Sequence, residues 1–101
     1  MHDLSFVWDE NKEQSNVRKH GVDFETAMLI WEGPIVQNVD DRFDYGETRY
    51  IAFGEVDGRV LAVVYTWRGD CRRLISARMA NRHERTSYRQ AITGIASDDT
   101  H

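Results

Sequence analysis

The pattern of hydrophobic and polar positions changes several times along the chain, and each change predicts a new structural element. The short apolar stretch Leu4–Trp8 predicts an opening strand. The polar segment that follows predicts a first helix, because Asp9 is a good N-cap and Gly21 can end a helix in the left-handed conformation. Apolar residues then recur at helical spacing between Phe24 and Trp31, which predicts a second helix with one buried face.

The middle of the chain predicts strands joined by turns. Asp57-Gly58 is the strongest hairpin signal, because a type I′ turn needs positive φ at both of its central positions. The nearly continuous apolar run Val60–Trp67 predicts a central strand of the sheet. The four strands of this region are expected over residues 35–39, 48–56, 60–67 and 71–79.

The last part of the chain predicts one more helix. Asn81 can cap its first turn, and Glu84 stands where the partner residue of a capping box is found. This helix is expected to end near Ile92, and residues 93–101 are expected to form a flexible tail. The sequence therefore predicts one α+β domain over residues 1–92, with two N-terminal helices, one C-terminal helix and an antiparallel sheet of about four to five strands.

The composition agrees with one small intracellular domain. At 101 residues the chain has the size of a single domain, and hydrophobic residues make up 41% of it. It contains no apolar run long enough to cross a membrane. Its single cysteine, Cys71, cannot form an internal disulfide, which is typical of a reducing compartment. We therefore expect a cytoplasmic protein.

Charge is distributed unevenly along the chain. The segment Arg59–Arg89 holds eight arginines and two acidic residues, whereas residues 1–58 hold 13 acidic and five basic residues. Arginine is the basic residue best suited to bidentate phosphate binding and to stacking on bases. The basic segment therefore favours a surface that faces a polyanion. The alternative is that arginines and acidic residues simply pair across the fold.

The sequence predicts neither a metal site nor another cofactor. Its four histidines show no ligand spacing, and Cys71 has no partner cysteine. There is no glycine-rich phosphate loop and no dinucleotide-binding fingerprint. Any chemistry is therefore expected to come from side chains alone.

Arginines and aromatic residues lie close together in the basic segment. Arginines stand near the ends of the last two predicted strands and along one face of the final helix. Guanidinium groups beside exposed rings suit single-stranded RNA, whose bases can stack on them. Trp67 could instead belong to the core, and the helix arginines could form a solvated face. The candidate RNA-binding residues are Trp67, Arg72, Arg73, Arg82 and Arg85.

Short motifs recur along the chain in a specific order and spacing. They are Phe6-Val7-Trp8-Asp9, Lys12, Asn16, Lys19-His20-Gly21-Val22, Phe24-Glu25, Ala27, Glu47-Thr48-Arg49, Gly54, Leu61–Arg68, Ile75–Ala80, Glu84-Arg85 and Tyr88. Together they resemble the BrnT toxins. The resemblance implies a RelE-like fold and a ribonuclease toxin of a type II toxin–antitoxin system that inhibits translation.

The same resemblance implies a protein partner. That partner is a BrnA-like antitoxin of the ribbon-helix-helix type, encoded alongside the toxin. Toxin and antitoxin are expected to form a hetero-oligomer, which reaches operator DNA only through the antitoxin and represses the operon.

Cleavage of RNA without a metal needs a base for the 2′-hydroxyl, stabilisation of the charge on the phosphorane, and an acid for the leaving oxygen. Arginines suit the second task, and His20 suits proton transfer near neutral pH. His20 could instead only cap the first helix, and Arg78 could form a structural ion pair with Glu47 or Glu84. Which residue is base and which is acid is left open. The candidate catalytic residues are Lys19, His20, Glu47, Arg49, Arg68, Arg78 and Tyr88.

A second hypothesis needs no catalysis. The arginine-rich surface would then dock an acidic partner or a nucleic acid, and the aromatic residues would all belong to the core. The two hypotheses differ in one measurable property, which is cleavage of RNA in the presence of EDTA.

Overall fold

The computed structural model describes residues 5–41 and 46–99, with side chains as far as residue 94. Within these residues a five-stranded sheet is accompanied by helices, which confirms the predicted α+β class. The helices are α1 (Glu10–His20), α2 (Phe24–Ala27), the 3₁₀ helix η2 (Met28–Glu32) and α3 (Arg82–Asp99). The strands are β1 (Phe6–Val7), β2 (Val36–Asp40), β3 (Arg49–Val56), β4 (Arg59–Arg68) and β5 (Cys71–Met79).

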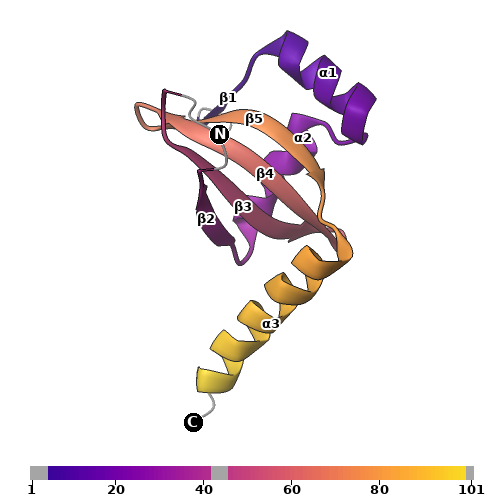
Figure 1. The fold of residues 1–101 in the computed structure, drawn as a ribbon, viewed down its shortest axis with the longest axis vertical. Coiled ribbons are helices and arrows are strands. Elements are labelled where there is room, and N and C mark those ends of the chain that lie inside the picture. The colour runs from indigo at the N-terminus through magenta and orange to yellow at the C-terminus, as the bar shows by residue number, and fades with distance from the viewer. Residues whose placement is uncertain (1–4, 42–45, 100–101) are drawn as a thin grey trace.

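The strands lie in the order β1-β5-β4-β3-β2, with β4 in the centre (Figure 1). Strands β2 to β5 form an antiparallel meander, as predicted. The prediction of a purely antiparallel sheet is wrong, because β1 pairs with β5 in parallel. The prediction followed the hairpin turns, which fix only the pairing of strands that are neighbours in sequence. Likeness to RelE stays a prediction.

The core lies between the sheet and the helical segment α2–η2, which Figure 1 shows behind the strands. Phe24 and Ile30 from this segment are completely buried in this core. Gly54 allows η2 to approach β3 closely, since a Cβ atom added at this glycine would lie 2.6 Å from the Cβ of Ile30. The second predicted helix thus exists, but it continues beyond Ala27 as a 3₁₀ helix.

Helix α1 is fixed to the edge of β5 by one buried side chain. The Asn16 amide donates to the Ala77 carbonyl at 2.8 Å and accepts from the Ala77 amide at 3.0 Å. It also donates to the Val22 carbonyl at 2.9 Å, in the turn that leads to α2. The side chain therefore takes the place of a neighbouring strand, and it leaves no Ala77 backbone group unpaired.

The predicted turn and cap signals are confirmed. The Asp9 carboxylate accepts from two amides of the first turn of α1, and Gly21 ends that helix with φ 72°. Asp57 and Gly58 have φ values of 52° and 80°, as a type I′ turn requires. Each of these signals acts within a few residues, which is why the sequence alone located it.

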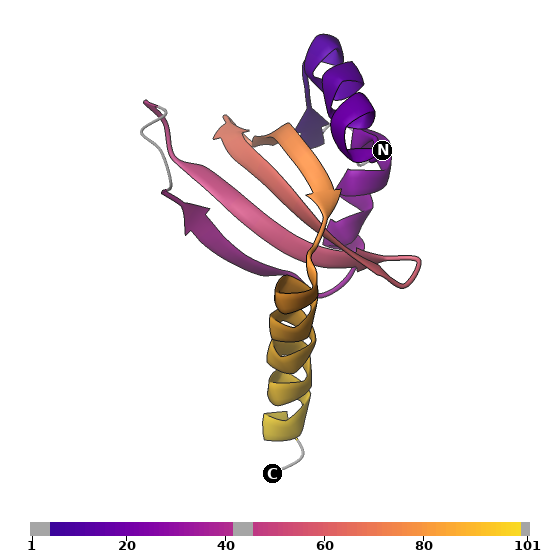
Figure 2. The same ribbon diagram turned by 45° about the vertical axis from the view of Figure 1, so that its right-hand side comes forward.

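Helix α3 projects away from the sheet, as Figure 2 shows from a second side. It begins at the expected capping box but continues to Asp99, so the predicted end near Ile92 is wrong. No proline follows Ile92, and Gly94 alone weakens a helix by only about 1 kcal/mol. The division into a domain over residues 1–92 and a tail stays a prediction. None of the helices in the described part of the chain is long and apolar enough to span a membrane.

Replacing Asn16 should destabilise the whole domain. Asn16→Ala leaves the buried backbone groups of Ala77 without partners, and we expect a loss of roughly 2–4 kcal/mol in the free energy of unfolding. Urea unfolding followed by circular dichroism measures this. The control is Gln14→Ala, an exposed position on the same helix, which should cost under about 0.5 kcal/mol. Equal stability of the two variants would contradict the role given to Asn16.

Candidate functional site: an arginine-bearing sheet face

The sheet has an open face, by which we mean the face turned away from α2 and η2. Side chains alternate between faces along a strand, so the register assigns each residue to one of them. Phe53, Ala62 and Arg78 form one row of cross-strand neighbours on this face. Thr66 and Arg73 form another row, roughly 13 Å away along the strands.

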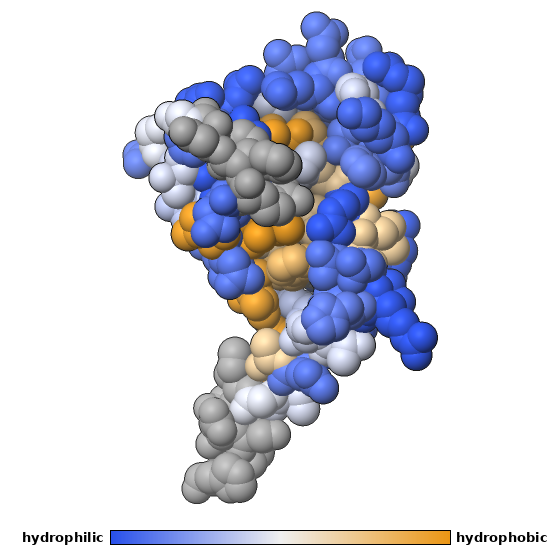
Figure 3. All heavy atoms as spheres, viewed as in Figure 1, coloured by the Kyte–Doolittle hydropathy of each residue, from blue (hydrophilic) through white to orange (hydrophobic). Residues whose placement is uncertain are grey.

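Between these two rows the open face is largely apolar. Ile51 and Val64 are neighbours there, flanked by Asn38 and Ser76. Figure 3 shows this face, and hydrophobic surface runs across its middle with hydrophilic side chains beside it. We call this strip the apolar floor, and charged groups lie at each end of it. Its members from the central strand, Ala62 and Val64, are almost fully buried, whereas Ile51 and Phe53 of β3 are partly exposed.

The first charged group, the hairpin cluster, consists of Glu47, Arg49, Arg68 and Arg73. Glu47 accepts hydrogen bonds from Arg68 Nη1 at 3.0 Å and from Arg49 Nε at 3.2 Å. The Arg68 hydrogen bond, followed by that from Arg49, lowers the pKa of Glu47 below its usual value. The carboxylate is therefore ionised at neutral pH and holds both guanidinium groups in place.

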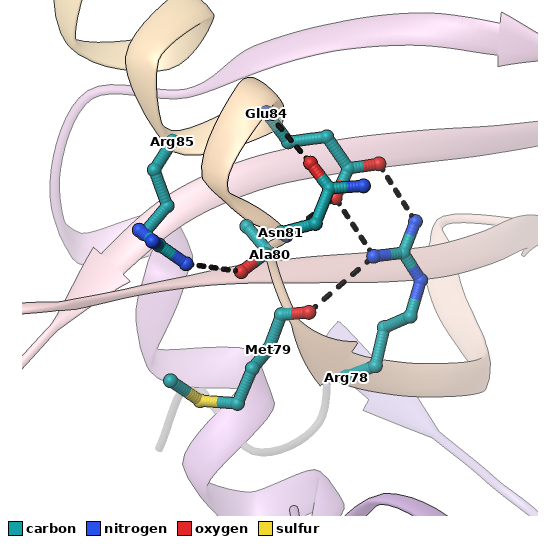
Figure 4. Close-up of polar contacts among 6 residues, drawn as sticks. All are labelled: Arg78, Met79, Ala80, Asn81, Glu84 and Arg85. Carbon is teal, nitrogen blue, oxygen red and sulfur yellow. Dashed lines mark hydrogen bonds and ion pairs between the residues drawn. The ribbon is translucent and has the colours of Figure 1, made fainter.

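The second charged group, the helix cluster, consists of Arg78, His83 and Glu84 at the start of α3. Arg78 binds both oxygens of Glu84, at 2.8 and 2.9 Å (Figure 4). This is one of the two structural ion pairs that the sequence left open for Arg78. Glu84 also accepts from the Asn81 amide at 2.9 Å, so one carboxylate both caps the helix and fixes the arginine. Its pKa is lowered, mainly by the Arg78 hydrogen bond.

His83 was missed as a catalytic candidate by sequence reasoning. It lines a groove of about 140 Å³ on the open face, together with Asn38 and Phe53. It stands outside the family motifs, and it was considered only as a possible metal ligand. Its position beside Glu84 in the first turn of a helix was the signal that could have found it.

Lys19 and His20 lie apart from both clusters. They are exposed at the end of α1 and line a separate groove of about 180 Å³, together with Ser76 of β5. Ser76 belongs to the open face, so this groove borders that face along the β5 edge. Of the candidate catalytic residues, the structure thus brings together Glu47, Arg49 and Arg68. It places His20 at the margin of the open face, beside the β5 edge.

Tyr88 has a setting different from the one expected of a catalytic tyrosine. It is buried beside Val60 and Ala80, and its hydroxyl donates to the Pro34 carbonyl at 2.8 Å. Burial raises its pKa above the usual value of 10.0, so it releases a proton less readily. Its contacts anchor α3 to the start of β2.

The remaining RNA-binding candidates are divided between α3 and the opposite face of the sheet. Arg82 is exposed on α3, whereas Arg85 donates to the Ala80 carbonyl at 2.9 Å (Figure 4). Trp67 and Arg72 are cross-strand neighbours on the face that also carries Tyr65. No three His, Cys, Asp or Glu side chains come together as a metal site would require in residues 5–41 and 46–94.

The fold and the open face define a small α+β protein with two charged clusters, each containing arginine, on one side of a sheet. Residues 8–84 match the family model described as ribonuclease toxin, BrnT, of type II toxin–antitoxin systems. The match covers more than half of the chain, which therefore belongs to the BrnT family of ribonuclease toxins. This confirms the resemblance seen in the motifs, and the matched span contains both clusters. No curated protein matches the chain.

The Arg78–Glu84 pair should make stability depend on pH. The pKa of Glu84 is lower in the folded protein than the usual value of 4.5, so its contribution to stability is present above about pH 4.5 and is lost as the pH falls through the folded pKa. Glu84→Gln removes this dependence. In urea unfolding we expect the variant to be less stable than the wild type at neutral pH, with the difference shrinking at about pH 3. A difference that stays constant would contradict the assignment.

Proposed function

We propose that the chain is an endoribonuclease toxin that cleaves RNA on the open face of its sheet and thereby inhibits translation. One observation carries this proposal: arginines from separate strands converge on a sheet face that α2 and η2 leave uncovered, inside the region that matches a ribonuclease toxin family. The apolar floor between the clusters suits unstacked bases, and the clusters suit the phosphates on either side.

In this mechanism the arginines stabilise charge. As the 2′-hydroxyl attacks, negative charge builds on the phosphorane oxygens. A guanidinium group held in a fixed orientation can donate hydrogen bonds to two of these oxygens at once. Arg68 and Arg78 are the main candidates, one in each cluster, because a carboxylate already orients each guanidinium group. Since the two clusters lie at opposite ends of the floor, one of these arginines would contact the phosphorane and the other a phosphate farther along the RNA. Arg49 and Arg73 would extend the phosphate contacts on the hairpin side.

Proton transfer is assigned to groups that border the floor. We place His83 first, because it lines the groove of the open face beside the helix cluster. His20, supported by Lys19, is the second candidate, since its groove borders the same face. Glu47 is ionised and half-exposed, so it can accept the proton of the 2′-hydroxyl, although its lowered pKa makes it a weak base.

The proposal extends to metal independence and to the partner. Arginine, histidine and carboxylate groups can supply all three tasks of the reaction, so no bound metal is required. A BrnA-like antitoxin of the ribbon-helix-helix type would neutralise the toxin in the cytoplasm by covering the open face, whose apolar floor suits a protein partner as well as bases. Repression of the operon would then depend on the antitoxin bound to operator DNA.

Arginine variants test the charge-stabilising role. Expression of the chain alone should arrest growth, and Arg68→Ala or Arg78→Ala should relieve the arrest. Cleavage of synthetic RNA by either purified variant should fall by at least about 10²-fold. The control is Arg59→Ala, an exposed arginine at the far end of the central strand, which should cleave normally. Normal toxicity of a folded Arg78→Ala variant would rule out the role of Arg78.

The same assay with EDTA separates the enzyme from a binding module. Wild-type cleavage that continues in EDTA supports metal-independent catalysis. Tight RNA binding with no cleavage under either condition supports the non-catalytic hypothesis.

Paired histidine variants test the proton carrier. We expect His83→Ala to lower kcat by about 10²- to 10⁴-fold and to remove one limb of the pH–rate profile, because a general acid or base would be lost. His20→Ala is the matched control, as it removes an exposed histidine near the same face. A larger loss in His20→Ala than in His83→Ala would reverse the assignment.

A further inference from the structure

The side of the β4–β5 hairpin opposite the open face carries a caged arginine. The guanidinium carbon of Arg72 lies 4.6 Å from the ring centre of Trp67 and 4.8 Å from that of Trp31. Tyr65 and Phe6 complete the cage, at 5.4 and 6.0 Å. Four rings from β1, η2 and β4 thus hold one cation in a fixed orientation.

This cation has no polar partner among the residues that the structure describes. Its Nε is buried and makes no hydrogen bond, and none of its five N–H groups meets a carboxylate or carbonyl within residues 5–41 and 46–94. Arg72 as a whole is half-buried, so part of the residue reaches solvent although its Nε does not. The rings stabilise the charge but accept no ordinary hydrogen bonds, so the exposed edge of the guanidinium remains available to an anion.

Trp67 supplies a second element of the same surface. Trp67 is 42% exposed although Arg72 packs against its ring. An exposed indole stacked on a guanidinium is a platform on which a nucleobase can stack. The next residue, Arg68, points to the open face, where it belongs to the hairpin cluster.

We infer that Trp67 and Arg72 form an RNA subsite outside the reaction centre, for a nucleotide several positions along the RNA from the cleaved one. The inference rests on the proposed function. One base stacks on Trp67, and the adjacent phosphate binds the terminal nitrogens of Arg72. The RNA then crosses the tip of the hairpin at Gly69-Asp70 and continues on the open face at Arg68 and Arg73.

The combination favours RNA over an acidic protein segment. A carboxylate would use the Arg72 edge but would leave the neighbouring indole without a contact, whereas a nucleotide has a phosphate for the arginine and a base for the indole. Stacking and phosphate contacts carry no base preference, so the subsite would add affinity without adding sequence specificity.

Binding and cleavage of RNA by matched variants test this subsite. The ligands are fluorescein-labelled 2′-O-methyl RNAs of about 4 and about 12 nucleotides, which lack the attacking hydroxyl, and binding is followed by anisotropy. We expect Arg72→Met to weaken binding of the longer RNA by about tenfold and to lower its salt-dependence slope by about 0.7, the value for one phosphate contact. The shorter RNA should be little affected. In cleavage of the longer unmodified RNA, KM should rise about tenfold with kcat unchanged.

Three further variants separate binding from folding. Arg59→Met removes the same charge at an exposed site and should change neither affinity nor KM. Trp67→Leu should weaken binding as Arg72→Met does, and Trp67→Phe should restore most of it, because a ring is again present for stacking. Thermal melting of each variant shows whether the domain is folded.

The outcomes distinguish this inference from the proposed function. Cleavage by the wild type with unchanged affinity and KM in folded Arg72→Met and Trp67→Leu would overturn the subsite alone. Binding that depends on Arg72 without any cleavage by the wild type would overturn the catalytic proposal and keep the subsite. Weaker antitoxin binding in Arg72→Met with unchanged RNA binding would overturn the subsite and assign the caged arginine to the protein partner.

Discussion

The Asn16 amide is the interaction on which the arrangement of the N-terminal half depends. It joins three parts of the chain, since it pairs with both backbone groups of Ala77 and with the carbonyl of Val22. Because β1 pairs with β5 only beside Arg72 and Arg73, the edge of β5 farther along needs another partner, which Asn16 provides. The same contact fixes the position of α1 and of the turn that leads into α2. The apolar side chains of α2 can then reach the core. A single polar side chain thus determines where the groove of α1 lies relative to the open face.

The charges of the open face are arranged in pairs rather than left free. Glu47 holds Arg49 and Arg68, and Glu84 holds Arg78, so part of the positive charge is already balanced. Under the proposed function, a phosphate would meet guanidinium groups that carboxylates already orient rather than isolated cations. This arrangement keeps the guanidinium groups oriented before RNA arrives, which reduces the cost of reorganisation during the reaction. It also means that the number of arginines overstates the net attraction for RNA.

The sequence predicted those features that local chemistry determines. The caps at Asp9 and Gly21, the Asp57-Gly58 turn and the capping box of Asn81 all depend on residues close in sequence, and all were located. The parallel pairing of β1 with β5 was missed because its two strands are separated by most of the domain. The same holds for the site. Arg49 and Glu47 are close in sequence, so their pairing is a local feature, whereas the choice of Glu47 or Glu84 as the partner of Arg78 depends on how the strands and α3 are arranged. Likewise, only the fold shows that Tyr88 is buried and that His83 borders the floor.

Helix α3 also divides the molecule into parts of unequal cooperativity. Tyr88 and Ile92 attach its first turns to Val60 and Pro34, whereas the later turns extend away from the sheet. Backbone hydrogen bonds in those later turns can open by fraying, with no cost in sheet packing, whereas those of β4 open only when the whole core does. Amide protons of residues 93–99 therefore belong to a separate folding unit, one whose opening free energy depends on helix propensity rather than on the hydrophobic core.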